Sequence, residues 1–270
     1  MNSISYGTYK IKTYVDLYAG LDMALSHGIR HFDLAELYKN HNLFGDMFYE
    51  LLEKYNLKRN DVWLTSKINF TTILKPDIEI INHIDKIFLD LRIDYIDLLL
   101  IHGPTLQSIK GYSPDENNLR IWRILSSYND NHNNKIYNIG VSNFNFDRLM
   151  TLNQSINMNK LKPIYCNQIE LNPFVFERQT KLIQYCKNNG IVITIYGLFH
   201  HFDKYTFYVD RNDLILWAKM NNFIPIISTT NKDHLEEILL SKNENNNIDK
   251  LNDIRFDSVA GFLYTKYNHN

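Results

Sequence analysis

Residues 77–102, DIEIINHIDKIFLDLRIDYIDLLLIH, contain the two kinds of segment from which the fold of this chain can be predicted. Apolar side chains recur at steps of three and four in residues 77–91, which is the spacing of an amphipathic helix. Residues 94–102 form a strongly apolar run, which is typical of a strand covered on both faces. A helix followed by such a strand predicts one unit of a parallel sheet with crossover helices.

The same alternation extends along most of the chain. Helices are predicted at residues 15–28, 43–55, 77–91, 119–128, 146–156, 177–190, 211–222 and 233–241. Strands are predicted at residues 29–35, 61–68, 94–102, 136–142, 163–171, 191–197 and 223–229. About eight such units in 270 residues predict an α/β fold of the closed (β/α)8 type, a TIM barrel. An open doubly wound sheet is the alternative, but it favours a GxGxxG turn, which the sequence lacks.

Composition narrows the class of protein. The chain is 44% hydrophobic and 22% charged, with a formal net charge of -1, so we expect neither a nucleic-acid nor a membrane partner. Cys166 and Cys186 do not form a CxxC pair and indicate reduced thiols rather than a metal site. The N-terminus lacks a signal-peptide pattern, and no linker interrupts the chain. We therefore expect a cytoplasmic protein with one domain, residues 1–270.

Polar residues stand where successive strands are predicted to end. HFDLAELY (31–38) places Asp33 at a strand end and Tyr38 shortly after it. The next strand ends in Lys67, within LTSK, and the following one in His102, within LLLIHGP. The active site of a (β/α)8 barrel lies at these carboxyl ends. The pattern therefore favours a charged cluster on one rim of the barrel.

Each of these residues also has a purely structural interpretation. Asp33 could cap a helix, because an aspartate at a strand-to-helix turn satisfies backbone N–H groups. Lys67 could be a surface lysine, and His102 could be a core histidine whose ring nitrogens are hydrogen-bonded. Tyr38 could simply pack against its neighbours. A catalytic role is favoured because all four residues fall at corresponding positions in three successive strand-and-helix units. A buried carboxylate is also costly unless a partner such as a lysine lies beside it.

Several segments resemble motifs of the aldo-keto reductases. They are GIRHFDLAELYKN (28–40), LTSKI (64–68), LRIDYIDLLLIHGP (91–104), IYNIGVSNF (136–144), CNQIELNPF (166–174) and LIQYCKNNGIVITIYG (182–197). The segments occur in the family's order, and the resemblance covers about residues 6 to 240. The fold of that family is a (β/α)8 barrel, in agreement with the prediction from periodicity.

The resemblance implies reduction of small aldehydes or ketones by NADPH, with Asp33, Tyr38, Lys67 and His102 as catalytic residues. Tyr38 would donate the proton that a reduced carbonyl oxygen needs. A tyrosine has an ordinary pKa of about 10, and a neighbouring lysine cation is expected to lower it. Asp33 would hold Lys67 charged. His102 would hydrogen-bond the substrate oxygen or share the proton relay.

The resemblance also implies a cofactor site. Ser142, Asn143 and Gln168 would bind the nicotinamide carboxamide, and Tyr196 would stack on the ring; strand-end polarity and core packing are the alternatives. The residues expected to bind the adenosine 2′-phosphate are Thr229, Thr230, Asn231, Lys232 and His234. His234 stands where the family has an arginine, so NADH remains an alternative to NADPH.

The sequence departs from the family's pattern in further ways. Most of the N-terminal hairpin of the family is missing, and Gly103 replaces a bulky tryptophan, which predicts a more open substrate pocket. Residues 196–213 are short compared with the loop that normally covers the cofactor pyrophosphate. This shortening keeps open an alternative function, a nicotinamide-binding sensor or interaction protein without turnover. A degenerate barrel with neither role is less favoured, and we expect a monomer from the resemblance.

Overall fold

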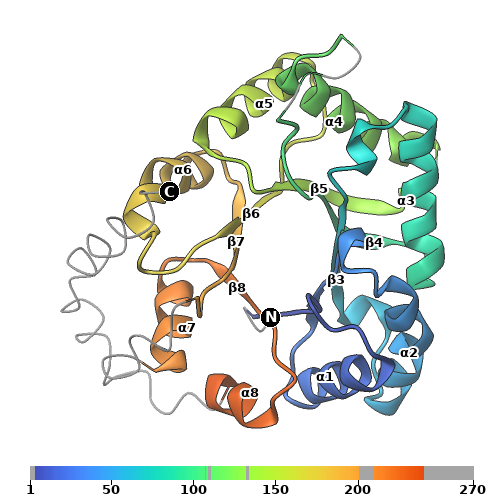
Figure 1. Ribbon diagram of the computed structural model, residues 1–270, viewed down its shortest axis with the longest axis vertical. Helices are drawn as coiled ribbons and strands as arrows, with labels where there is room; N and C mark the ends of the chain where they lie inside the picture. The colour runs from blue at the N-terminus through green and yellow to red at the C-terminus, as the bar shows by residue number, and fades with distance from the viewer. Residues whose placement is uncertain (1–3, 107, 109–110, 132–133, 201–209, 240–270) are drawn as a thin grey trace, which may run out of the picture.

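The computed structural model describes residues 4–106, 108, 111–131, 134–200 and 210–239. Its strands form a closed ring in chain order, and every neighbouring pair is parallel, including β1 with β8. Figure 1 looks onto this ring, with the helices arranged around its outside. The predicted (β/α)8 barrel is therefore confirmed.

The strands are short and begin and end as follows: β1 (Ser5–Gly7), β2 (His31–Asp33), β3 (Trp63–Ile68), β4 (Ile96–Ile101), β5 (Ile136–Ser142), β6 (Cys166–Glu170), β7 (Val192–Tyr196) and β8 (Ile224–Ile227). The α-helices are α1 (Tyr14–Ser26), α2 (His41–Lys54), α3 (Asp77–Leu91), α4 (Pro114–Asn131), α5 (Phe146–Met158), α6 (Phe176–Asn188), α7 (Arg211–Met220) and α8 (Lys232–Leu239). Within the described residues, single turns of 3-10 helix are η1 (Glu36–Tyr38), η2 (Arg59–Asp61) and η3 (Thr72–Leu74).

The helix and strand within residues 77–102 have the predicted form. Helix α3 spans Asp77–Leu91, the predicted bounds, and Arg92 ends it in a left-handed conformation with φ 54°. All six residues of β4 are buried, as expected for a strand between the barrel interior and a layer of helices. Gly45 of α2 lies against the Asp90 carbonyl, where a Cβ would overlap the backbone, so this glycine allows α2 and α3 to pack closely.

The largest differences from the prediction concern two elements. Helix α4 begins at Pro114, five residues earlier than the apolar pattern indicated, because its first turn is polar and is held by a capping box between Ser113 and Glu116. In that box the Ser113 N–H donates to Glu116 Oε2 over 2.7 Å. Strand β1 was not predicted, because its three residues are too few to show an alternation of apolar and polar side chains. Part of the shortened segment 196–213, residues 201–209, lies outside the described residues.

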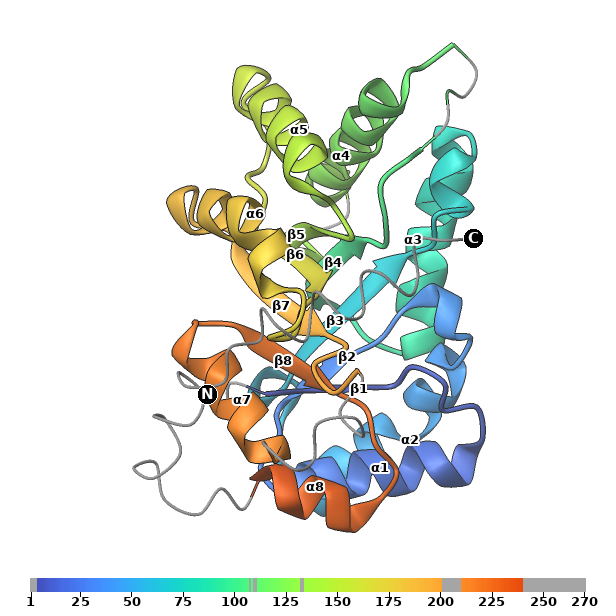
Figure 2. The ribbon, with the colours of Figure 1, turned by 60° about the vertical axis from the view of Figure 1, so that its left-hand side comes forward.

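Apolar side chains fill two regions of the barrel. The larger core lies between strands and helices and includes the fully buried Trp122, Phe32 and Phe44. A smaller cluster consists of Leu98 and Leu100 of β4 with Cys166 of β6. Side chains alternate along a strand, so these three share a face that is distinct from the helix-covered face. Figure 2 shows the same strands tilted across the molecule, with α4, α5 and α6 above them and α1, α2, α7 and α8 below them.

Candidate active site

The four predicted catalytic residues lie at the carboxyl ends of adjacent strands. Asp33 is the last residue of β2, Lys67 the fifth of β3, and His102 directly follows β4. Tyr38 closes η1, the turn that follows β2. Asp33 is paired in register with Thr65 and Lys67 with Leu100, so along the series Asp33, Lys67 and His102 each residue lies two positions further along its strand than the one before. The structure thus brings all four residues together.

Lys67 is the centre of the cluster and is completely buried. Its Nζ donates to Asp33 Oδ1 over 2.5 Å, to the Leu34 carbonyl over 2.9 Å and to the Tyr38 hydroxyl over 3.1 Å. An ammonium has three N–H donors, so all three are used. Burial alone lowers the Lys67 pKa, but the negative charge of Asp33 and the hydrogen bonds raise it above its ordinary value overall. Lys67 is therefore a cation at neutral pH.

Tyr38 has a pKa that differs in direction from the sequence prediction. Burial raises the Tyr38 pKa, and the opposing effect of Lys67, although present, is smaller, so that the pKa lies above its ordinary value. The expected lowering was wrong because the prediction counted the cation and left out the desolvation of the phenolate. At neutral pH the Tyr38 hydroxyl carries its proton and accepts a hydrogen bond from Lys67.

His102 faces Tyr38 as a neutral imidazole. The two ring centroids are 5.8 Å apart in an edge-to-face arrangement, and the Phe70 ring lies 5.1 Å from the His102 ring. Burial, together with the charge of Lys67, lowers the pKa of His102 to about 3. Its Nδ1 is buried and has no hydrogen-bond partner among the described residues. The ring can orient an oxygen by hydrogen bonding, whereas an imidazolium is disfavoured here.

Sequence reasoning missed a contact that completes the cluster. Gln168 of β6 donates from Nε2 to Asp33 Oδ2 over 2.8 Å, across the barrel from β2. Each Asp33 carboxylate oxygen thus accepts a hydrogen bond, one from Lys67 and one from Gln168. Strand alternation could have placed Gln168 on the inner face with Cys166, but its partner depends on the closed ring.

The residues predicted to hold the nicotinamide form a connected network. Asn143, in a left-handed conformation with φ 63°, donates from Nδ2 to the His102 carbonyl over 2.8 Å and to Ser142 Oγ over 3.2 Å. The Tyr196 hydroxyl donates to Asn143 Oδ1 over 2.6 Å, and Ser142 Oγ donates to the Gln168 carbonyl over 3.0 Å. The ends of β5, β6 and β7 are therefore tied to the residue that follows β4.

The residues predicted to hold the 2′-phosphate lie apart from this network, after β8. Asn231 Oδ1 accepts from the N–H groups of Asp233 and His234, so Asn231 caps helix α8. Thr229 Oγ1 accepts from the Asn231 N–H. Thr230 is exposed, and Lys232 begins α8, but its side chain lies outside the described residues. In this arrangement Asn231 satisfies the helix N–H groups that the prediction assigned to a phosphate.

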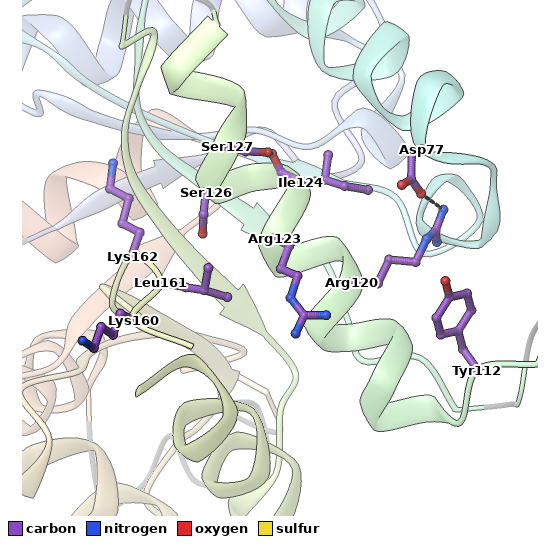
Figure 3. A pocket seen from close by; sticks show the side chains of 10 residues that line it. All are labelled: Asp77, Tyr112, Arg120, Arg123, Ile124, Ser126, Ser127, Lys160, Leu161 and Lys162. Carbon is purple, nitrogen blue, oxygen red and sulfur yellow. Dashed lines mark hydrogen bonds and ion pairs between the residues drawn. The ribbon is translucent and has the colours of Figure 1, made fainter. Parts of the chain in front are cut away.

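The outer surface of the barrel carries a further cavity. A cavity of about 610 Å³ lies outside the barrel, lined by residues of α3, α4 and the segment after α5 (Figure 3). Its cations are largely engaged: Arg120 pairs with Asp77, and Arg123 donates to Asn159. In the described part of the chain, no group of histidine, cysteine and acidic side chains is arranged to hold a metal ion. None of the described helices has the length and apolar character needed to cross a membrane.

A family model described as "Aldo/keto reductase family" matches residues 3–213. The chain belongs to the aldo/keto reductase family. Dihydrodiol dehydrogenase 3 of Bos taurus is 33% identical over 185 residues, which cover 64% of this chain and 55% of the bovine protein. An uncharacterised oxidoreductase of Schizosaccharomyces pombe is 29% identical over 253 residues, covering 86% of this chain and 79% of the yeast protein.

Solved structures of the family have the same barrel. The aldose reductase of Schistosoma japonicum has a TM-score of 0.76 at 20% identity, with 96% of this chain and 88% of that chain covered. The Bombyx mori aldo-keto reductase, solved in complex with NADP, has a TM-score of 0.75 at 20% identity, with 97% and 89% covered. The fold resemblance thus extends over nearly the whole aldo-keto reductase barrel, whereas the match to the bovine sequence is confined to just over half of that protein.

Proposed function

We propose that this protein is an NADP(H)-dependent oxidoreductase that reduces small aldehydes or ketones to alcohols, with Tyr38 as the proton donor. One observation carries the proposal: a charged, fully buried Lys67 contacts both Asp33 and the Tyr38 hydroxyl at the strand ends, beside a neutral His102. Membership of the aldo/keto reductase family supports the reaction class.

The proposed proton transfer follows from the charges around Tyr38. A carbonyl oxygen becomes negative as the carbonyl carbon is reduced, and it needs a proton donor in contact. Tyr38 has a raised pKa and therefore still holds its proton at neutral pH. When that proton leaves, Lys67 at 3.1 Å stabilises the phenolate, and Asp33 keeps Lys67 charged. His102 donates a hydrogen bond to the substrate oxygen without introducing a competing charge.

The network beside the tetrad fits a nicotinamide cofactor, which when bound would supply the hydride. Gln168 uses its Nε2 on Asp33, while its Oε1 makes no hydrogen bond to any described residue, so it is available to a carboxamide N–H. Ser142 Oγ donates to the backbone carbonyl of Gln168, and Asn143 Nδ2 donates to Ser142 Oγ, so these two residues hold the backbone that carries this acceptor. Tyr196 offers a partly exposed ring at the end of β7. We propose NADPH as the main cofactor, with Thr230 and His234 as exposed groups near the phosphate.

The substrate is proposed to have an apolar side beside its carbonyl. Tyr9, 53% exposed, lies with its ring 5.2 Å from that of Tyr38, and Phe70, 41% exposed, lies against His102. These two rings flank the approach to the tetrad. A Cβ added at Gly103 would lie 3.3 Å from Phe70 Cδ1, so a bulky side chain there would displace Phe70.

Loss of reduced-nicotinamide absorbance with a panel of aldehydes and ketones tests the proposal, using NADPH and NADH separately. Tyr38→Phe should lower kcat by about 10²- to 10⁴-fold, the usual contribution of a general acid. Tyr128→Phe is the matched control, because it removes another buried hydroxyl, 2.5 Å from Asp85 Oδ1 on helix α3. Unchanged turnover in Tyr38→Phe would refute the mechanism. Cofactor binding by fluorescence without turnover would favour the sensor instead.

A further inference from the structure

A second cavity opens at the end of the barrel opposite the tetrad. Its volume is about 440 Å³, and four of its lining residues are the first residues of their strands. They are His31 of β2, Trp63 of β3, Val192 of β7 and Ile224 of β8. The tetrad lies where strands end, so this amino-end cavity is a separate space. Its volume falls within the range of about 300–1,000 Å³ that is typical of small-molecule sites.

The walls of the amino-end cavity are aromatic and apolar. The rings of Trp63 and Tyr165 stack with centroids 5.8 Å apart and planes 28° apart, and the His31 ring meets Trp63 edge-on at 6.1 Å. Leu98 lies on the inner side and belongs to the small apolar cluster against which Trp63 and Val192 pack. Flat aromatic surfaces above an apolar floor favour a planar, apolar guest.

The charged residues at the edge of the cavity already have partners. Arg30 donates to two backbone carbonyls, Asp61 accepts from the Lys58 N–H, and Asp97 pairs with Arg59 over 2.8 Å. Asp97 is neutralised by Arg59, and the opposite charges of Arg30 and Asp61 offset each other at the cavity edge, so a charged guest would lose its hydration against the aromatic walls without gaining a net counter-charge. An uncharged molecule avoids that cost.

His31 provides a polar contact within these walls. Trp63 Nε1 can only donate, so Thr65 Oγ1 accepts from it at 3.2 Å, and the hydroxyl hydrogen is then available for His31 Nε2 at 2.9 Å. We assign the proton of the neutral imidazole to Nδ1 on this basis. His31 is neutral because burial lowers its pKa to about 3. Nδ1 makes no hydrogen bond to a described residue and is thus a donor available to a guest.

We propose that the amino-end cavity is a second ligand site, which binds an uncharged, planar aromatic molecule carrying a hydrogen-bond acceptor. The ring would lie against Trp63 and Tyr165, and the acceptor would face His31 Nδ1. The site is independent of the proposed reaction, because it shares no residue with the tetrad or with the nicotinamide network.

The chain has three tryptophans, so labelling with 5-fluorotryptophan gives a direct test by ¹⁹F NMR. Trp63→Phe identifies the resonance of Trp63 among those of Trp122 and Trp217. Titration of the full-length protein with 1-naphthol should shift the Trp63 resonance in a saturable way. 1-Naphthoate, with the same ring and a negative charge, should bind more weakly.

Two matched variants locate the binding site. Tyr165→Leu removes the stacking partner in the cavity and should weaken 1-naphthol binding about three- to tenfold. Phe70→Leu removes a comparably exposed ring at the tetrad end and should leave the dissociation constant unchanged. The proposal is overturned if the Trp63 resonance does not move, if 1-naphthoate binds as well as 1-naphthol, or if Phe70→Leu weakens binding and Tyr165→Leu does not.

Discussion

Replacing Lys67 by methionine removes the charge at the centre of the tetrad while keeping a side chain of similar length. Lys67 is fully buried and its Nζ makes three hydrogen bonds, so the variant leaves the Asp33 carboxylate buried with only Gln168 as a donor. Breaking a buried ion pair from one side costs about 3–5 kcal/mol. We expect the lower end, about 3 kcal/mol of unfolding free energy, because the Gln168 hydrogen bond remains. Urea unfolding with linear extrapolation measures this loss.

A double variant shows whether the loss comes from the stranded charge. Lys67→Met with Asp33→Asn removes both charges, and an amide oxygen can still accept from Gln168, so the double variant should be more stable than Lys67→Met alone. The deficit of Lys67→Met should also shrink at acid pH, because an unpaired buried carboxylate has a raised pKa and takes up a proton more readily in the folded state. Additive effects, with a coupling below about 0.5 kcal/mol, would refute the reasoning.

Three further predictions follow from the charges and the ion pairs. Because the pKa of Tyr38 is raised and that of His102 is about 3, neither group changes charge between about pH 5 and pH 8, so kcat for reduction should be flat across that range in a stopped-flow assay. A slope assigned to an imidazole there would contradict this. Burial lowers the pKa of His31 to about 3 and of His41 to about 4, so the unfolded chain binds more protons than the folded chain below about pH 6.5. Each histidine should therefore reduce the unfolding free energy by up to about 1.4 kcal/mol per pH unit as the pH falls. An unfolding free energy that rises on acidification would contradict this prediction. Asp97→Asn breaks a largely buried ion pair at the far end of the barrel, in which each side chain is 12% exposed, and should lower the unfolding free energy by about 2 kcal/mol, measured in urea, with kcat unchanged.

The sequence predicted the barrel because its units are periodic and locally consistent. Residues 77–91 have an apolar stripe at helical spacing, and the observed helix has the predicted bounds. The tetrad could be predicted for a related reason, since parallel strands bring their carboxyl ends to one rim. Strand β1 could not be delimited, because three residues carry too little pattern.

Properties that depend on the assembled interior were not accessible from the sequence. The direction of the Tyr38 pKa is a balance between burial and the Lys67 charge, and the extent of burial is known only from the closed barrel. The contact between Gln168 and Asp33 joins residues 135 positions apart, with no local signal linking them. The capping of α8 by Asn231, a residue predicted to bind a phosphate, could also not be read from the sequence, because it depends on the side chain reaching the first N–H groups of the helix.

The hydrogen bond from Gln168 to Asp33 has a consequence for how the site comes into being. It links the second half of the chain to the first, so a fragment ending after β4 would contain Asp33, Tyr38, Lys67 and His102 yet lack one donor to the carboxylate. The charge arrangement is therefore completed late, when the ring closes and not when the first strands pair. Two separately produced halves, cut between β4 and β5, would regain the arrangement only by docking with each other.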